Sequence, residues 1–269
     1  MDKNLNQKFK ANPYNGVNKL IQSSDIINIM KKLNINDFST TNLKSYQKSF
    51  THKSYCKLRD YDEYKYPGDN YLPLQNDSYE TIEFLGDSIL GSVVSSYIYR
   101  RFHLIYGETE GFLTKLKIRL VCGENLADVS EKMKLSEYLI ISKHIEENCS
   151  GRGNKNILED VLEALIGTLY IDKGYEYTEK FIIAVIETYC DFTEIILKDT
   201  NYKDQISRYF QQTFSLYPKY KTEKYDAVFR SSIFNGETLI KVGTGDTKKK
   251  AEQDVSKKAL IHFNVITAF

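Results

Sequence analysis

Two apolar stretches that each carry a pair of acids limit most strongly what this chain can fold into. The first, YETIEFLGDSILG, holds Glu83 and Asp87 four positions apart. The second, NILEDVLEALIGTLYIDKG, holds Asp160 and Glu163 three positions apart. Both spacings place the two acids on one face of a helix, where like charges repel. Since an unpaired carboxylate is costly to bury, any fold of this chain must compensate these charges.

If the two helices pack together, their four carboxylates converge. Gly86, Gly91 and Gly167 would let the helices approach closely, because glycine has no Cβ. Four negative charges in a partly buried pocket require protons or a cation, and oxygen ligands without His or Cys favour Mg²⁺ or Mn²⁺. Such a cluster suits phosphodiester hydrolysis, in which metal ions activate water and stabilise the charge on the phosphate. The alternative is that these acids are only solvated, as acids on amphipathic helices often are.

Three further polar residues, Glu80, Glu159 and His52, have simpler explanations than a catalytic role. Glu80 fits a capping box with Asp77, and Glu159 fits one with Asn156. For Glu159 we expect the capping role. His52 lies far along the chain from the acids, and we expect it to be structural.

The pattern of the chain divides it near residue 200. A polar start, residues 1–40, contains one amphipathic segment, SDIINIMKKLNI, and we expect it to be frayed. Residues 44–55 are predicted to be helical, and Pro and Gly predict a long loop over 56–78. From Tyr79 to about Phe181 the helical period dominates. Within this part Tyr97, Tyr99 and Phe102 have the spacing of core residues.

The pattern after residue 200 is that of a small α+β module. A helical segment, QISRYFQQTF, is followed by the runs AVFRSSIF and ETLIKVG, with Asn235-Gly236 between them. Asn-Gly between two such runs is a strong hairpin signal, because both residues tolerate positive φ. A last helix is predicted after Thr247, its N-cap, with an apolar stripe at Ala251, Val255, Ala259 and Phe263. Two helices packed on one sheet face would form a compact module.

The C-terminal part is more basic than the rest of the chain. Residues 203–269 hold 12 Lys and Arg against 7 Asp and Glu, a formal charge of +5, so the remaining residues carry −4 of the total of +1. A basic segment on a mildly acidic body indicates a polyanionic partner, although a lysine-rich face is often only solvated.

Several classes of protein are disfavoured by what the sequence lacks. The four cysteines are widely separated and contain no CxxC pair, so we expect free thiols in a reducing compartment. The first residues lack the apolar core of a signal peptide, and no apolar run approaches the length of a membrane span. We therefore expect an intracellular, soluble, cytoplasmic protein without a membrane partner.

Several motifs, in the same order along the chain, resemble those of ribonuclease III, the double-stranded-RNA endonucleases. YETIEFLGDSILG closely resembles the family signature, and SFTHKSY resembles the motif that precedes it. EGFLTKLKIRLVCGENLA is similar to the central helix, and NKNILEDVLEALIGTLYIDKG to the second acidic motif. GTGDTKKKAEQDVSKKAL resembles the closing helix of a double-stranded-RNA-binding domain. The resemblance covers roughly residues 40–267.

The resemblance implies an α + (α+β) fold in three parts. Residues 1–40 form an N-terminal extension, and residues 41–198 form an all-helical catalytic domain. Residues 201–267 form an α-β-β-β-α double-stranded-RNA-binding domain.

The resemblance also implies roles for the acids. It assigns Glu83, Asp160 and Glu163 to the binding of divalent metal, and it places Asp87 beside them through metal-bound water. Asp87 and Glu163 are the pair that we expect to be catalytic. Glu80 occupies the family's auxiliary acidic position, so a metal or RNA role competes with its capping role.

The implied reaction is Mg²⁺-dependent hydrolysis of both strands of double-stranded RNA, with Mn²⁺ as an alternative metal. The resemblance further implies 5′-phosphate and 3′-hydroxyl ends, 3′ overhangs, and a homodimer that forms one cleavage valley. One alternative is a catalytically silent scaffold that binds double-stranded RNA, or a ribosome-associated protein, on the same fold. Another is a metal-dependent phosphatase, which would leave the basic module unexplained.

Three lysines open the predicted last helix, where free N–H groups favour phosphate: Lys248, Lys249 and Lys250. Lys248 and Lys249 match the paired lysines that span the groove in the family. Duplex RNA hides its bases in a deep, narrow groove, so such modules read shape, phosphates and 2′-hydroxyls.

Two departures from the family pattern predict weaker or differently registered RNA binding. Ser207 and Arg208 stand where Gln and Glu are typical. Between Tyr220 and Phe229 the chain is about three residues short, and the family's Gly-Pro-x-His loop is missing. One of the usual minor-groove contacts would then be lost.

Overall fold

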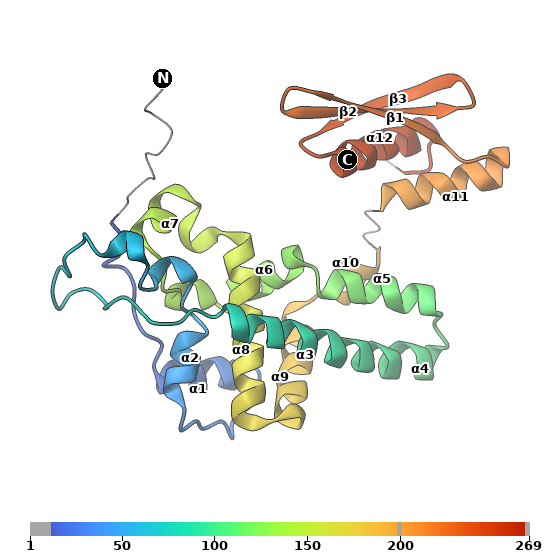
Figure 1. The fold of residues 1–269 in the computed structure, drawn as a ribbon. Helices are drawn as coiled ribbons and strands as arrows, with labels where there is room; N and C mark the ends of the chain where they lie inside the picture. Colours follow the sequence, from blue (N-terminus) through green and yellow to red (C-terminus); the bar gives the residue numbers. More distant parts are fainter. Residues whose placement is uncertain (1–11, 198–200, 267–269) are drawn as a thin grey trace, which may run out of the picture. The chain divides into compact units, whose positions relative to one another are not determined.

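The chain forms two compact units, residues 1–195 and 196–269. The computed structural model describes residues 12–197 and 201–266, and Figure 1 shows them as a ribbon. The first unit is built of helices, and the second combines a three-stranded sheet with two helices. The α + (α+β) fold class predicted from the sequence is therefore confirmed.

The helices before residue 198 are mostly short, and two are long. They are α1 (Ser23–Lys32), α2 (Leu43–Lys48), α3 (Glu80–Ile98), α4 (Leu104–Tyr106), α5 (Glu110–Leu120), α6 (Gly123–Lys132), α7 (Lys143–Asn148), α8 (Lys155–Lys173), α9 (Tyr175–Tyr189) and α10 (Phe192–Leu197). The 3₁₀ turns are η1 (Lys53–Tyr55), η2 (Arg59–Tyr61), η4 (Leu135–Tyr138) and η5 (Gly151–Gly153), and η3 (Tyr99–His103) is a π-helical turn.

Helix α8 forms the centre of the helical unit. Every residue of α8 from 161 to 169 is buried, as expected for a helix that is apolar on nearly all sides. Helix α3 crosses it (Figure 1), and glycines form the crossing point. A Cβ on Gly86 would lie 1.8 Å from the backbone oxygen of Glu163, and one on Gly167 would lie 2.3 Å from that of Ile82. The close approach predicted for these two glycines is confirmed. A Cβ on Gly91, by contrast, would meet no atom of another described part of the chain within 4 Å.

Residues from 12 to 40 pack on the same core, so the fraying expected for residues 1–40 does not apply to this described part. Ile26 and Met30 of α1 are fully buried in the main apolar cluster, and Ile21 lies beside them. The amphipathic face of α1 therefore buries enough apolar surface to hold residues 12–40 against the unit. Residues 1–11 lie outside the described part.

Two predicted helices are shorter than the sequence pattern indicated. The helix expected over 44–55 ends at Lys48, because Thr51 pairs with Ile140 and the His52 N–H donates to the Ile140 carbonyl at 3.0 Å. The predicted central helix is divided into α5 and α6 at Cys122, whose backbone is extended.

The aromatic residues at the end of α3 divide between core and surface. Tyr97 is buried, and Phe102 packs against the core. Tyr99 is 47% exposed, because it begins the π-helical turn that follows α3 and changes the helical register. The core assignment of Tyr99 was wrong. The four cysteines are free thiols, as expected.

The second unit has the α-β-β-β-α order. Helix α11 (Tyr202–Phe214) precedes β1 (Lys219–Tyr225), β2 (Val228–Asn235) and β3 (Thr238–Gly245), and α12 (Lys248–His262) closes the unit. The strands are antiparallel in the order β1-β2-β3, with a bulge between Ile233 and Phe234. Its core joins residues of both helices and β2: Ile206, Phe210, Ile233, Val255, Ala259 and Leu260.

The predicted hairpin between β2 and β3 is confirmed with a shift of one residue. Asn235 is the last residue of β2 and pairs with Thr238, so Gly236 and Glu237 form the turn. Gly236 has φ +61°, which favours glycine at this position. In the described ranges, no helix is long and apolar enough to cross a membrane.

Candidate active site and RNA-binding surface

Glu163 is the most deeply buried acid of the predicted set. It lies on α8 at the crossing with α3, and 6% of its surface is exposed. Burial, followed by the charges of Asp87, Glu159, Glu83 and Asp160, raises the pKa of Glu163 to about 8. The fold therefore brings the four predicted acids into one electrostatic cluster, in which negative charge is not fully compensated.

The other acids of the cluster differ in exposure. Burial, and then the charge of Asp160, raises the pKa of Glu83. Burial also raises the pKa of Asp160, although a hydrogen bond from Tyr79 and the charge of Lys53 act in the opposite direction. Asp87 is exposed on α3, so its carboxylate is accessible to a substrate.

Tyr79, which the sequence interpretation missed, holds Asp160. Its hydroxyl donates to Asp160 Oδ2 at 3.0 Å, and the residue is 1% exposed. Its backbone N–H donates to the Thr51 carbonyl at 2.9 Å, and its ring lies 5.8 Å from that of His52. A tyrosine directly before the acidic helix was the signal available in the sequence.

His52 has the structural role that the sequence predicted. It caps the turn η1, where its Nδ1 accepts from the Ser54 N–H at 3.2 Å. Burial lowers its pKa, which favours the neutral ring that can accept this bond.

Glu80 is not part of a capping box with Asp77. Helix α3 begins at Glu80, and its N-cap residue, Tyr79, makes no side-chain capping bond. The Glu80 carboxylate instead pairs with Lys53 Nζ at 2.7 Å. Lys53 thus brings a positive charge to the edge of the acid cluster.

Glu159 is a fifth acid of the cluster, and its predicted capping role was wrong. Helix α8 starts two residues earlier than expected, with Asn154 as the N-cap that accepts from the Asn156 N–H. The Glu159 carboxylate lies against Gly123 at the start of α6, where a Cβ would be 2.2 Å from Oε2. Burial, followed by Asp160 and Asp87, raises the pKa of Glu159.

The donor chemistry of the cluster fits a hard divalent cation. Its ligands are carboxylate oxygens, and the raised pKa of Glu163 marks negative charge that a cation would stabilise. In residues 12–197 and 201–266, however, no three Asp, Glu, His or Cys side chains are already placed to hold a metal ion. A cation bound here would therefore have to draw the carboxylates closer together.

The three lysines predicted to bind RNA, Lys248, Lys249 and Lys250, lie at the exposed start of α12. Thr247 caps this helix as predicted, since its hydroxyl accepts from the Lys250 N–H at 3.2 Å. Lys250 Nζ pairs with Asp246 at 2.7 Å, and Lys248 Nζ lies 4.0 Å from Glu252. Lys249 is exposed and forms no ion pair within the described residues.

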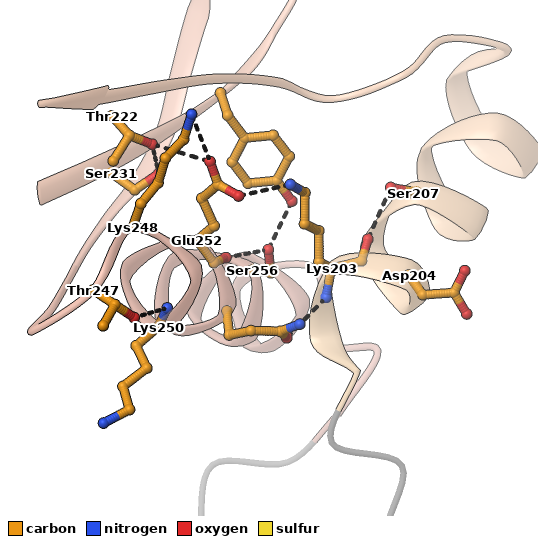
Figure 2. A network of polar contacts seen from close by, with 12 residues as sticks. Lys203, Asp204, Ser207, Thr222, Ser231, Thr247, Lys248, Lys250, Glu252 and Ser256 are labelled. Carbon is orange, nitrogen blue, oxygen red and sulfur yellow. Dashed lines mark hydrogen bonds and ion pairs between the residues drawn. The ribbon is translucent and has the colours of Figure 1, made fainter. Parts of the chain in front are cut away.

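A polar network fixes the start of α11 against α12 (Figure 2). Its centre is Glu252, whose side chain is 12% exposed and accepts from Lys203 Nζ at 2.7 Å. Thr222 of β1 donates to the same carboxylate at 3.4 Å. The Lys203 ammonium also lies 4.9 Å from the centre of the Tyr220 ring. Lys203 and Lys248 thus share one largely buried acid.

Both departures noted in the sequence have a clear local structure. The Ser207 hydroxyl donates to the Lys203 carbonyl of its own helix at 2.8 Å. Arg208 pairs with Asp204 at 3.1 Å. Strands β1 and β2 are joined by Asp226 and Ala227 alone, so the connection is short.

The amino-acid sequence is similar to known ribonucleases. The family model described as Ribonuclease-III-like matches residues 43–189. The "Probable ribonuclease 3" of Acanthamoeba polyphaga mimivirus is 36% identical over 197 residues, which are 70% of this chain and 35% of that protein. The "Ribonuclease 3" of Borreliella burgdorferi is 30% identical over 206 residues, which are 73% of this chain and 82% of that protein.

Similar solved structures include the nuclease domain of ribonuclease III from Campylobacter jejuni. It aligns with a TM-score of 0.48 and 27% identity, over 61% of this chain and 98% of that chain.

A helical unit that gathers carboxylates is followed in the chain by an α-β-β-β-α unit, and the helical unit is the part that the ribonuclease family model matches. The family match covers more than half of the chain, and the Borreliella relative is covered over most of its length. The chain therefore belongs to the ribonuclease III family of endoribonucleases. It spans about a third of the length of the mimivirus protein.

Proposed function

We propose that the protein hydrolyses both strands of double-stranded RNA at the carboxylate cluster and requires Mg²⁺ or Mn²⁺. The observation that carries the proposal is the group of acids around the buried Glu163. Burial, and then the charges of these acids, raise the pKa of Glu163 to about 8. A bound divalent metal would supply an activated water and stabilise charge on the phosphate and the leaving oxygen. The products would be 5′-phosphate and 3′-hydroxyl ends with 3′ overhangs.

The acids of the cluster would have two roles, binding the metal and taking part in the reaction. Glu83, Asp160 and Glu163 would hold the metal. Tyr79 keeps one oxygen of Asp160 hydrogen-bonded, which orients the other oxygen. Asp87, the exposed acid, would contact the metal through water and, with Glu163, form the catalytic pair.

The second unit would supply most of the affinity for duplex RNA. Lys248, Lys249 and Lys250 lie exposed at a helix N-terminus, where the helix dipole and free N–H groups favour phosphate. Lys249 is the lysine not engaged by an acid in the described residues, so we propose it as the strongest phosphate contact of the three.

We further propose a homodimer, because one carboxylate cluster cuts one strand. Among the large apolar side chains that the helical unit exposes are Phe84 of α3 at 76% and Ile118 of α5 at 60%, and these two helices pack together. A two-fold interface through these residues would bury both and bring two clusters to one duplex. Light scattering should give a dimer. A monomer of 31.3 kDa that still makes double-strand breaks would contradict it.

The substrate class can be tested with matched duplexes. The protein should cut labelled duplex RNA in Mg²⁺ and leave a DNA duplex of the same sequence intact, because the A-form groove and 2′-hydroxyls are particular to RNA. EDTA should stop the reaction. Equal cleavage of both duplexes would contradict the proposed substrate, and retained RNA binding without cleavage would favour the silent scaffold.

A further inference from the structure

The loop between residues 56 and 78, together with Tyr14, lines an open pocket that has no role in the proposed reaction. Its volume is about 610 Å³, within the range of roughly 300–1,000 Å³ that ligand sites occupy. Four tyrosines line it: Tyr14, Tyr61, Tyr64 and Tyr66. Tyrosine provides a large flat surface at a low cost in side-chain entropy.

The base of this loop is fixed by backbone hydrogen bonds. Cys56 and Gln75 pair in a parallel bridge. The Lys57 N–H donates to the Gln75 carbonyl at 2.9 Å, and the Gln75 N–H donates to the Tyr55 carbonyl at 3.0 Å. The Tyr55 hydroxyl donates to the Leu72 carbonyl at 2.8 Å. The pocket is therefore formed before any ligand binds.

Three of the four rings are held by contacts within the unit. The Tyr61 hydroxyl donates to the Ser54 carbonyl at 3.1 Å, and the Tyr66 hydroxyl donates to the Tyr71 carbonyl at 2.6 Å. The Tyr14 ring meets the Tyr66 ring edge-on, with centroids 5.7 Å apart. These contacts orient the three rings along one wall of the pocket.

Tyr64 is the exception among the four. It is partly buried, and within the described ranges it forms neither an aromatic pair nor a side-chain hydrogen bond. Its ring is therefore available to stack on a flat ligand.

The charges and amides of the pocket favour a neutral aromatic ligand. Lys57 and Asp62 both line the pocket, so its lining has one charge of each sign and no net positive charge to attract a phosphate. Gln75 Nε2 donates to the Pro73 carbonyl at 2.7 Å, which orients the amide. With the exposed amide of Asn76, it offers groups that can hydrogen-bond the edge of a nucleobase.

The pocket lies close to the acid cluster along the chain. Asn76 precedes Glu80 by four residues, so their Cα atoms are at most about 14 Å apart. We propose that this pocket binds the base of an unpaired nucleotide in the RNA substrate. The proposal rests on the proposed function, since it concerns the RNA that the acids would cut.

The affinity of the full chain for three labelled RNAs tests this proposal. One is a blunt duplex, and the others carry four unpaired nucleotides at the 5′ or the 3′ end. Fluorescence anisotropy in EDTA measures binding without cleavage. Base–aromatic stacking predicts that one of the tailed RNAs binds about tenfold more tightly than the blunt duplex. Tyr64→Ala should remove this difference, and Tyr64→Phe should keep it. Tyr175→Ala, at a 39% exposed tyrosine of α9, is the control and should also keep it.

A second measurement uses the unmodified protein. A tail with 4-thiouridine should cross-link to a peptide within residues 56–78. Equal affinity of the wild-type protein for all three RNAs, or cross-links confined to other peptides, would overturn the pocket assignment. Cleavage of the blunt duplex is scored separately: its loss in the wild-type protein would refute the proposed function, whereas the tail preference reports only on the pocket.

Discussion

At the scale of single residues, the acids differ because their surroundings differ. Glu163 is enclosed by α3 and α8, whereas Asp87 lies at the surface of α3. Asp160 has a buried hydrogen-bond donor, the Tyr79 hydroxyl. Neighbours of this kind orient ligand oxygens and tune their basicity. Tyr79 is thus a positioning residue for the proposed metal site.

Replacement of Tyr79 by Phe should weaken metal binding with little effect on folding. The substitution removes one hydrogen bond to Asp160, and loss of such a partner typically lowers metal affinity or activity by about 10–100-fold. Binding of Mn²⁺ to the RNA-free protein, followed by electron paramagnetic resonance, measures this directly. Tyr97→Phe is the control, because Tyr97, on α3, is buried like Tyr79 and donates to a carboxylate, Glu187, at 2.8 Å. Equal Mn²⁺ affinity of both variants and the wild-type protein would refute the positioning role.

The raised pKa of Glu163 predicts how metal-free stability depends on pH. The folded protein holds its proton up to a pKa of about 8, whereas the unfolded chain releases it near about 4.3. The contribution of Glu163 to the free energy of unfolding is therefore fully present below the unfolded pKa and is lost as pH rises toward 8. The loss is at most about 1.4 kcal/mol per pH unit.

Urea unfolding in EDTA between pH 5 and pH 8 tests this dependence. The wild-type protein should lose more stability over that interval than Glu163→Gln, which cannot ionise. Added Mg²⁺ should restore wild-type stability at pH 8. If the stability of both proteins depends on pH in the same way, the pKa of Glu163 is not raised in the folded protein.

At the scale of elements, the crossing of α3 and α8 positions the site. Gly86 and Gly167 let the two backbones meet, and the acids follow from that contact. The sequence predicted this crossing because glycines lay beside acids in apolar helices. It could not assign Gly91, since helical spacing alone does not tell which glycine faces a neighbour.

Gly86→Ala should separate the helices and destabilise the protein. A Cβ at this position would lie 1.8 Å from the Glu163 carbonyl oxygen, so the backbone of α8 must move, at a cost of about 1–3 kcal/mol or more. Gly91→Ala in the same helix is the matched control. The added Cβ would meet no atom of another described part of the chain within 4 Å. The free energy of unfolding of this variant should therefore rise by about 0.5–1 kcal/mol, because alanine loses less backbone entropy on folding than glycine. Urea denaturation measures both, and equal stability of the two variants would contradict the described crossing.

Two errors of the sequence interpretation, the capping roles of Glu80 and Glu159, share one physical cause, the exact start of a helix. Both failed because α3 begins two residues later, and α8 two residues earlier, than the capping boxes assumed. The long helices, the hairpin and the cap at Thr247 could be predicted from the local sequence pattern. The role of Tyr79 could not be predicted in this way, because its hydrogen bond to Asp160 joins residues 81 positions apart.

At the scale of the whole molecule, one unit would carry out catalysis and the other would provide affinity for RNA. The acids lie in the unit of residues 1–195, and the lysines of α12 lie in the unit of residues 196–269. Each unit has its own apolar core. The first unit should therefore keep its fold without the second.

Removal of residues 201–269 should weaken RNA binding and preserve some cleavage. Phosphate contacts dominate the salt dependence of binding, so the truncated protein should have a higher KM and a shallower dependence on salt. Cleavage should survive at low ionic strength. Complete loss of activity under those conditions, in a chain that circular dichroism shows to be helical, would contradict this division.

The most direct test of the central claim is single-turnover cleavage of end-labelled duplex RNA by Glu163→Gln. The change replaces a charged carboxylate ligand with a neutral amide. Because the metal would stabilise the transition state by several kcal/mol, its weaker binding should lower the cleavage rate by at least about 100-fold. Duplex binding should persist, and Glu131→Gln, at an exposed acid of α6, should cut at the wild-type rate. If Glu163→Gln instead cuts at a near-normal rate in saturating Mg²⁺, the carboxylate cluster is not the site of hydrolysis.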